Sequence, residues 1–132
     1  MTLTSLLPAI AAAFFLLFLV SVLYSDGVNW KSSWLFPAVL SFAFLLFSLQ
    51  AIATEGVFGF WTEHIDNLWG NQIWFDLLLA VGIGWFLIVP QAKALGMSLL
   101  PWLVLIVCTG CIGFLAMISR MLYLREQSNQ HE

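Results

Sequence analysis

Residues 32–54 read SSWLFPAVLSFAFLLFSLQAIAT, and this stretch contains no Asp, Glu, Lys or Arg. A helix needs about 20 apolar residues to cross the hydrocarbon core of a bilayer, so the stretch is long enough to span a membrane. Residues 1–25, 77–92 and 94–119 also lack these charged residues, and each reaches a spanning length alone or with its flanks. The sequence therefore predicts four transmembrane helices.

The composition of the 132-residue chain supports this prediction. The chain is 62% hydrophobic and 8% charged, whereas soluble domains are usually about a quarter charged. So short a chain could not bury this much apolar surface away from water, and lipid is the expected surrounding. The net charge of −3 gives no basic surface that could follow a phosphate backbone, which excludes nucleic-acid binding. We expect an all-α polytopic membrane protein with one domain over residues 1–132.

Proline residues mark the ends of two predicted helices. Pro90 is expected to end the third helix, and Pro101 lies at the start of the fourth. The first helix could instead be a signal peptide, but it lacks the basic residues and the small-residue cleavage site of one. We therefore expect it to be retained. The predicted spans are 4–24, 34–54, 72–90 and 100–123.

Four spans would place the N-terminus, the 55–71 loop and the C-terminus on one membrane face, here named side A. The loops at 25–33 and 91–99 would lie on the other face, side B. Each side then carries two basic residues: Arg120 and Arg125 on side A, and Lys31 and Lys93 on side B. Because the two numbers are equal, the positive-inside rule does not decide which side is cytoplasmic. The basic C-terminal end favours side A as the cytoplasmic side, with both termini there.

Three polar residues are predicted to share one depth near side A. Gln50 lies close to the end of the second span, Asp76 close to the start of the third and Arg120 close to the end of the fourth. At 1.5 Å per residue, all three would lie roughly 5–6 Å below the same surface. A charge within a span is costly unless it is paired, and a guanidinium suits a carboxylate. We predict an intramembrane cluster in which Asp76 pairs with Arg120 beside Gln50, either to fix helix register or to form a proton relay or headgroup pocket.

The loop between the second and third spans has an amphipathic pattern. Its apolar residues follow helical spacing: Phe58, Trp61, Ile65, Leu68 and Trp69. This pattern predicts a short helix over 58–69 that lies in the interface on side A. The helix is either a lipid-anchored connector or a lid, in which Glu63, His64 or Asp66 supplies acid–base chemistry. Together with Asp76, Glu63 and His64 are the candidate catalytic residues.

The fourth run contains a C-x-x-C pattern at Cys108 and Cys111. Redox chemistry requires an accessible thiolate, whereas these thiols would lie near the middle of a span. Packing is the better interpretation, because small residues on the third and fourth helices allow close backbone approach. We predict a tight antiparallel hairpin of these two helices. Its packing residues are Ala80, Gly84, Thr109 and Gly113.

The stretch Asn71-Gln72-Ile73-Trp74-Phe75-Asp76-Leu77-Leu78-Leu79, followed by Leu122-Tyr123-Leu124-Arg125-Glu126, resembles a family of small bacterial integral membrane proteins of unknown function. The resemblance covers roughly residues 67–126. It implies a helical protein of the bacterial inner (cell) membrane and gives no activity. The family pattern has no arginine at the position of Arg120, so the predicted pair rests on depth alone. A fainter likeness is to small polytopic isoprenoid-modifying enzymes, which use membrane-embedded carboxylates.

Two functions remain open. The first is a non-enzymatic membrane component, such as an accessory subunit or a small homo-oligomer, in contact with membrane lipids and a membrane protein partner. The second is an enzyme or carrier for a lipid or isoprenoid with Asp76 as its acid–base group. Neither histidine lies within a predicted span and no metal-ligand spacing is present, so we expect no haem, metal or other cofactor. A pocket that holds Asp76 would favour the second function.

Overall fold

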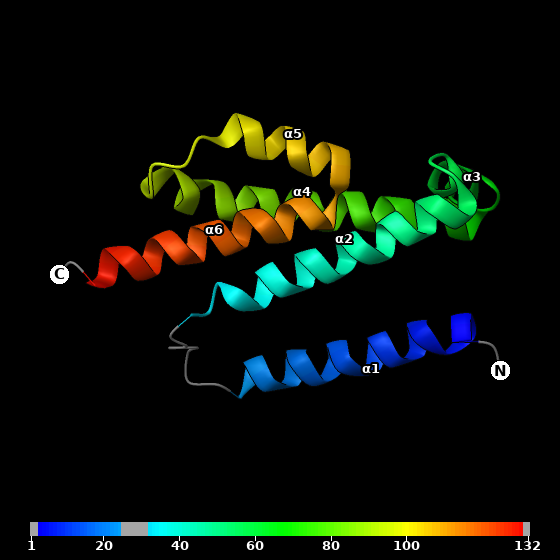
Figure 1. Ribbon diagram of the computed structural model, residues 1–132, viewed down its shortest axis with the longest axis horizontal. Helices are drawn as coiled ribbons and strands as arrows, with labels where there is room; N and C mark the ends of the chain where they lie inside the picture. Colours follow the sequence, from blue (N-terminus) through cyan, green and yellow to red (C-terminus); the bar gives the residue numbers. More distant parts are fainter. Residues whose placement is uncertain (1–2, 25–31, 131–132) are drawn as a thin grey trace. The chain divides into compact units, whose positions relative to one another are not determined.

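The computed structural model describes residues 3–24 and 32–130, and these residues form six helices and no strand (Figure 1). The all-α prediction is therefore confirmed. The helices are α1 (Leu3–Leu23), α2 (Leu35–Glu55), α3 (Gly59–Ile65), α4 (Leu68–Ala94), α5 (Leu99–Thr109) and α6 (Cys111–Gln130). Among the described residues, three helices are long and apolar enough to cross a membrane: Thr4–Leu23, Leu35–Glu55 and Leu68–Ala94.

The chain forms two compact units, Met1–Lys31 and Ser32–Glu132, and each is described by itself. The described part of the first unit is α1 with Tyr24 after it. Large apolar side chains are exposed from Leu7 to Leu23, as expected of a segment that faces lipid. The Ser21 hydroxyl donates to the Phe18 carbonyl at 2.7 Å, so this polar group needs no partner outside the helix.

In the second unit, α2 and α6 pack against each other in opposite directions. The Ser41 hydroxyl donates to the Ile112 carbonyl at 2.8 Å, and the Ser119 hydroxyl donates to the Trp34 carbonyl at 2.8 Å. A step of seven residues, two helical turns, separates the two contacts on each helix. Both serines are buried, and a buried hydroxyl is stable only with a partner. These two bonds therefore define the antiparallel register of α2 and α6.

The buried core of this unit lies between α4, α5 and α6. Its members are Ile88, Ala92, Ile106, Met117 and Met121. Large apolar side chains elsewhere on α2 and α4 are exposed, which suits a protein whose outer surface is covered by lipid.

The prediction of one helix over 100–123 is wrong. The helix breaks at Gly110, whose φ of 61° and ψ of −123° define a backbone conformation that residues with a Cβ rarely adopt. α6 then runs back along α5. The two helices pack so closely that a Cβ added to Gly113 would lie 2.9 Å from the Leu105 carbonyl oxygen. The chain thus forms a helical hairpin within the predicted span (Figure 1). An apolar run has no local feature that shows such a reversal.

Backbone polar groups at the Gly110 turn are bonded within the hairpin. The Thr109 hydroxyl donates to the Leu105 carbonyl at 2.7 Å and accepts the Gly113 N–H at 2.9 Å. The Gly110 N–H donates to the Ile106 carbonyl at 2.6 Å. The first N–H groups of a helix have no partner within it, so Thr109 acts as a cap for α6.

α4 continues past Pro90 to Ala94, so the prediction that this proline ends the helix is wrong. Pro90 cannot donate a backbone hydrogen bond, and its ring disturbs the preceding turn. The Gln91 side chain donates to the Leu87 carbonyl at 3.2 Å and so bonds to this turn. The carbonyl that loses its helical donor is that of Phe86, four residues before the proline, so the Gln91 bond strengthens the turn without replacing the lost bond.

The predicted 58–69 helix is shorter than expected, because α4 already begins at Leu68. The Asn67 side chain caps α4 by accepting the Gly70 N–H at 2.8 Å. The Asn71 side chain donates to the His64 carbonyl at 3.0 Å and joins α3 to α4. Gly70 is required here, since a Cβ at this position would collide with the Glu63 carbonyl.

Candidate functional site

The predicted cluster of Gln50, Asp76 and Arg120 does not form. Arg125 donates to the Gln91 side chain at 2.8 Å, which places the last turns of α6 beside the end of α4. Asp76 lies about four helical turns before Gln91, or roughly 22 Å along α4. All three cluster residues are exposed, and among residues 3–24 and 32–130 no ion pair joins Asp76 to Arg120.

The reason for this error is the direction of α6. The Gly110 reversal makes α6 run parallel to α4, so Arg120 lies toward the end of α4 instead of its start. Gln50 is also separated from Arg120, because Ser41 already lies beside Ile112 at the start of α6. Residues of α2 beyond Ser41 therefore extend past the hairpin. The predicted depths assumed that the helix with Arg120 runs antiparallel to α4. Because α6 runs parallel to α4 instead, residues counted to the same depth do not meet.

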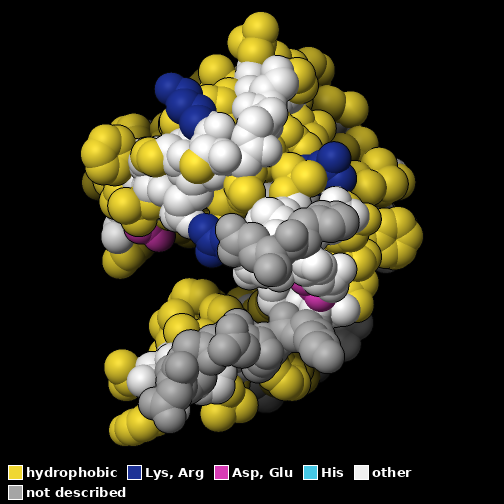
Figure 2. Space-filling view, turned by 90° about the vertical axis from the view of Figure 1, so that its left-hand side faces the viewer, with side chains coloured by type: hydrophobic (Ala, Val, Ile, Leu, Met, Phe, Trp, Pro, Cys, Tyr) yellow, Lys and Arg dark blue, Asp and Glu magenta, His cyan; other side chains and the backbone are white. Residues whose placement is uncertain are grey.

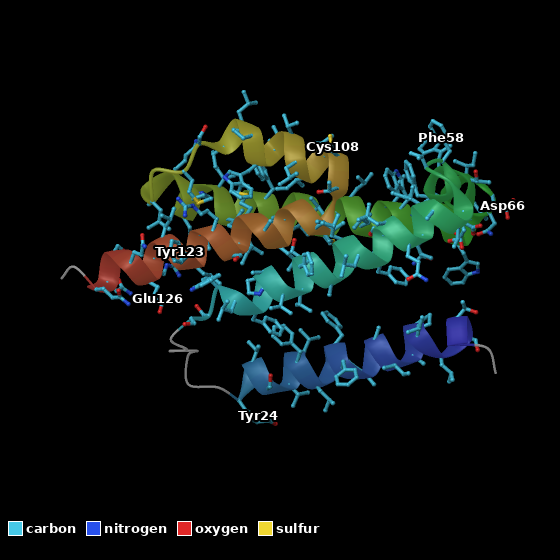
Figure 3. The ribbon with its side chains drawn as sticks, viewed as in Figure 1. Tyr24, Phe58, Asp66, Cys108, Tyr123 and Glu126 are labelled. Atoms are coloured by element: carbon cyan, nitrogen blue, oxygen red, sulfur yellow. The ribbon has the colours of Figure 1, made fainter. Side chains whose placement is uncertain are left out.

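The region around α3 contains the candidate residues Glu63 and His64. The His64 ring lies 5.0 Å from the Trp74 ring at an angle of 71°, and its Nδ1 atom is hydrogen-bonded to the Phe60 carbonyl. The ring contact with Trp74 holds α3 on α4, so it gives His64 a packing role. Glu63 and Asp66 are exposed, and Figure 3 labels Asp66 directly after α3.

The four predicted packing residues do not share one contact between two helices. A Cβ added to Gly84 would lie 2.5 Å from the tip of the Phe114 ring, so α4 and α6 approach closely there. Thr109 and Gly113 are in contact at the hairpin turn. Ala80 is exposed. Both cysteines are free thiols that flank the turn, and Figure 3 labels Cys108 at the end of α5.

The polar groups that do meet are at the other end of the unit, around Trp34 and Tyr123. The two rings are 5.4 Å apart and nearly perpendicular at 80°. The Gln127 amide donates to the Tyr123 hydroxyl at 2.7 Å. The Arg120 guanidinium lies 5.6 Å from the centre of the Tyr123 ring, within the range of a cation–π contact.

Glu126 completes this cluster from the next turn of α6. Its Oε1 atom accepts the backbone N–H of Ser32 at 3.1 Å. Ser32 has a φ of 68°, in the left-handed region that residues other than glycine seldom occupy. The carboxylate therefore supports a strained backbone just before α2. Tyr123 and Glu126 are labelled along α6 in Figure 3.

These side chains surround a hollow of about 200 Å³. We call it the headgroup hollow, and its lining residues are Trp34, Tyr123, Glu126, Gln127 and Gln130. It combines a carboxylate, amide groups and two aromatic rings, with a guanidinium behind one ring. This site was not predicted from the sequence. The spacing of Arg120, Tyr123 and Gln127 by three and four residues was the available signal, because it places them on one helix face.

Charge is distributed unequally between the two ends of the second unit. All of its described basic residues lie at the end that holds the hollow: Lys93, Arg120 and Arg125 (Figure 2). Four acidic residues lie toward the α3 end: Glu55, Glu63, Asp66 and Asp76. Lys31 lies outside the described residues. Within the second unit the 55–71 loop and the last turns of α6 lie toward opposite ends, which differs from the expected common side. The tie of basic residues between two membrane sides stays a prediction.

Comparison with protein-family models, with curated proteins and with solved structures gives no significant match for this chain.

Proposed function

We propose that the chain is a non-enzymatic component of a membrane, with the role of an accessory subunit. The observation that carries this proposal is the exposure of apolar side chains along α1, α2 and α4, while the core of the second unit is small. Such surfaces suit lipid and other transmembrane helices. Asp76 is exposed on α4, and the headgroup hollow lies toward the opposite end of this helix.

The proposed topology has three crossings and one re-entrant hairpin. α4 has 27 residues, about 40 Å of helix, which exceeds the roughly 30 Å of the hydrocarbon core. α5 has 11 residues, about 16 Å, and reaches only halfway. We propose that α5 and α6 enter and leave on the same side. α3 would lie in the interface on the other side.

The charge distribution supports one orientation. The end with Lys93, Arg120 and Arg125 is cytoplasmic under the positive-inside rule, and the α3 end faces away from the cytoplasm. Three crossings would place the two chain ends on opposite sides, whereas four would place them together. The resemblance noted above supports a bacterial inner membrane as the location.

Cysteine labelling tests this topology. After both native cysteines are replaced by alanine, single cysteines at the exposed positions Ser98 and Ser128 are treated with a membrane-impermeant maleimide. We expect labelling of both from the cytoplasmic side only, and labelling of Thr62→Cys from the other side only. Labelling of Ser98→Cys and Ser128→Cys from opposite sides would show a continuous fourth span and refute the hairpin topology.

A comparison of lipid profiles tests the non-enzymatic role. Lipid extracts are compared from cells that overproduce the wild type or the combined variant Glu63→Gln, His64→Ala and Asp76→Asn. We expect identical profiles, because these residues pack or lie exposed and have no substrate to act on. A lipid species that accumulates with the wild type alone, at equal protein level, would favour the lipid- or isoprenoid-handling enzyme.

A further inference from the structure

The headgroup hollow has acceptors and donors in an arrangement that fits a zwitterion. The Glu126 carboxylate uses Oε1 for the Ser32 N–H and has a second oxygen beside the hollow. Carboxylates bind ammonium groups through short, charge-assisted hydrogen bonds. Aromatic rings add to this attraction, and Trp34 and Tyr123 form two sides of the hollow.

The same hollow also has groups that bind an oxyanion. The Trp34 indole N–H has no hydrogen-bond partner among the residues that the structure describes, and Gln127 and Gln130 carry amide donors. Arg120 does not line the hollow, but its guanidinium lies 5.6 Å from the centre of the Tyr123 ring and adds positive charge nearby. A ligand with an ammonium and a phosphate separated by a short linker would satisfy both sets of groups.

We propose that the headgroup hollow binds a membrane lipid with a phosphoethanolamine headgroup. The ammonium lies at Glu126 against the Trp34 and Tyr123 rings, and the phosphate lies at the amide groups of Gln127 and Gln130. A primary ammonium is preferred over a trimethylammonium, because the carboxylate needs N–H donors. An anionic phosphoglycerol headgroup has no cation for Glu126, so that carboxylate would repel it.

The position of the hollow indicates that the ligand is a lipid and not a soluble compound. It lies where α2 begins and α6 approaches its end, beside the basic residues that we assign to the cytoplasmic surface. Tryptophan and tyrosine favour this headgroup level of a bilayer. This step rests on the proposed membrane topology, whereas the chemistry of the hollow does not depend on orientation.

Native mass spectrometry tests the proposal. The full-length protein is delipidated in detergent and then mixed with equal amounts of phosphatidylethanolamine, phosphatidylglycerol and phosphatidylcholine. We expect phosphatidylethanolamine to be the most frequent bound lipid. Glu126→Gln keeps an oxygen acceptor for the Ser32 N–H but removes the charge, and it should lower the ratio of bound phosphatidylethanolamine to phosphatidylglycerol about tenfold, which equals about 1.4 kcal/mol.

Matched variants make the result specific. Glu63→Gln removes a charge at the other end of the unit and should leave the ratio unchanged. Arg120→Gln removes a positive charge near the hollow and should reduce binding of all three phospholipids. Equal ratios for Glu126→Gln and the wild type, or a wild-type preference for phosphatidylglycerol or phosphatidylcholine, would overturn the proposal. Displacement of the lipid by an equal concentration of soluble phosphoethanolamine would also overturn it, because the ligand would then be a free metabolite. The cysteine-labelling result is independent of all these outcomes.

Discussion

Gly82 and Gly84 form a matched pair on α4 for a test of helix packing. A methyl group on Gly84 would lie 2.5 Å from the Phe114 Cζ atom and 3.0 Å from its Cε1 atom. A methyl group on Gly82 would have no neighbour within 4 Å. Both changes to alanine gain about 0.8–1.0 kcal/mol of helix propensity. Overpacking costs typically about 1–3 kcal/mol, and only Gly84→Ala incurs it.

We therefore expect Gly84→Ala to be less stable than Gly82→Ala by about 1–3 kcal/mol. The free energy of unfolding is measured by titration with sodium dodecyl sulfate in mixed micelles, followed by circular dichroism. In a Phe114→Leu background, where the ring is absent, the difference should fall below about 0.5 kcal/mol, because the two positions are coupled. Equal stability of the two alanine variants, or a difference unaffected by Phe114→Leu, would refute the packing of α4 on α6 at this point.

Three further changes test other contacts. Ser41→Ala and Ser119→Ala should each lower the free energy of unfolding by about 0.6 kcal/mol in the same titration, and no loss in either variant would contradict the α2–α6 register. Gly70→Ala should speed amide hydrogen exchange in α3 alone, since the methyl group collides with its backbone; unchanged exchange would argue against that docking. Asp76→Asn and Arg120→Gln should be additive within about 0.3–0.5 kcal/mol in a double-mutant cycle, whereas a larger coupling would restore the pair predicted from the sequence.

The apolar helices could be predicted from the sequence because length and lack of charge are local properties. The predicted span 34–54 is α2 at Leu35–Glu55, and the predicted span 4–24 is α1 at Leu3–Leu23. The boundaries of α4 were less accurate, since the helix continues through Pro90 to Ala94. Proline is tolerated within apolar helices that pack against neighbouring helices, and a pattern of apolar residues does not contain that packing.

The candidate site could not be predicted, because it depends on the direction of α6. Gly110 lies inside the predicted 100–123 span, and its positive φ has no unique signal in the sequence. Once α6 reverses, Arg120 moves away from Asp76 and Tyr123 meets Trp34. The strained backbone at Ser32 and its bond to Glu126 join residues far apart in the chain. Such contacts follow from tertiary structure and not from periodicity.

The reversal at Gly110 also has a consequence for biosynthesis. In the proposed orientation, a continuous span over 100–123 would require the segment after it, with Arg125 and Glu126, to be moved through the translocation channel. Arg120 would also lie within the inserting span, where a charged side chain is costly. In the hairpin topology this segment stays on the side of the ribosome. The last part of the chain to leave the ribosome could then fold onto α2 and α4 without crossing the lipid.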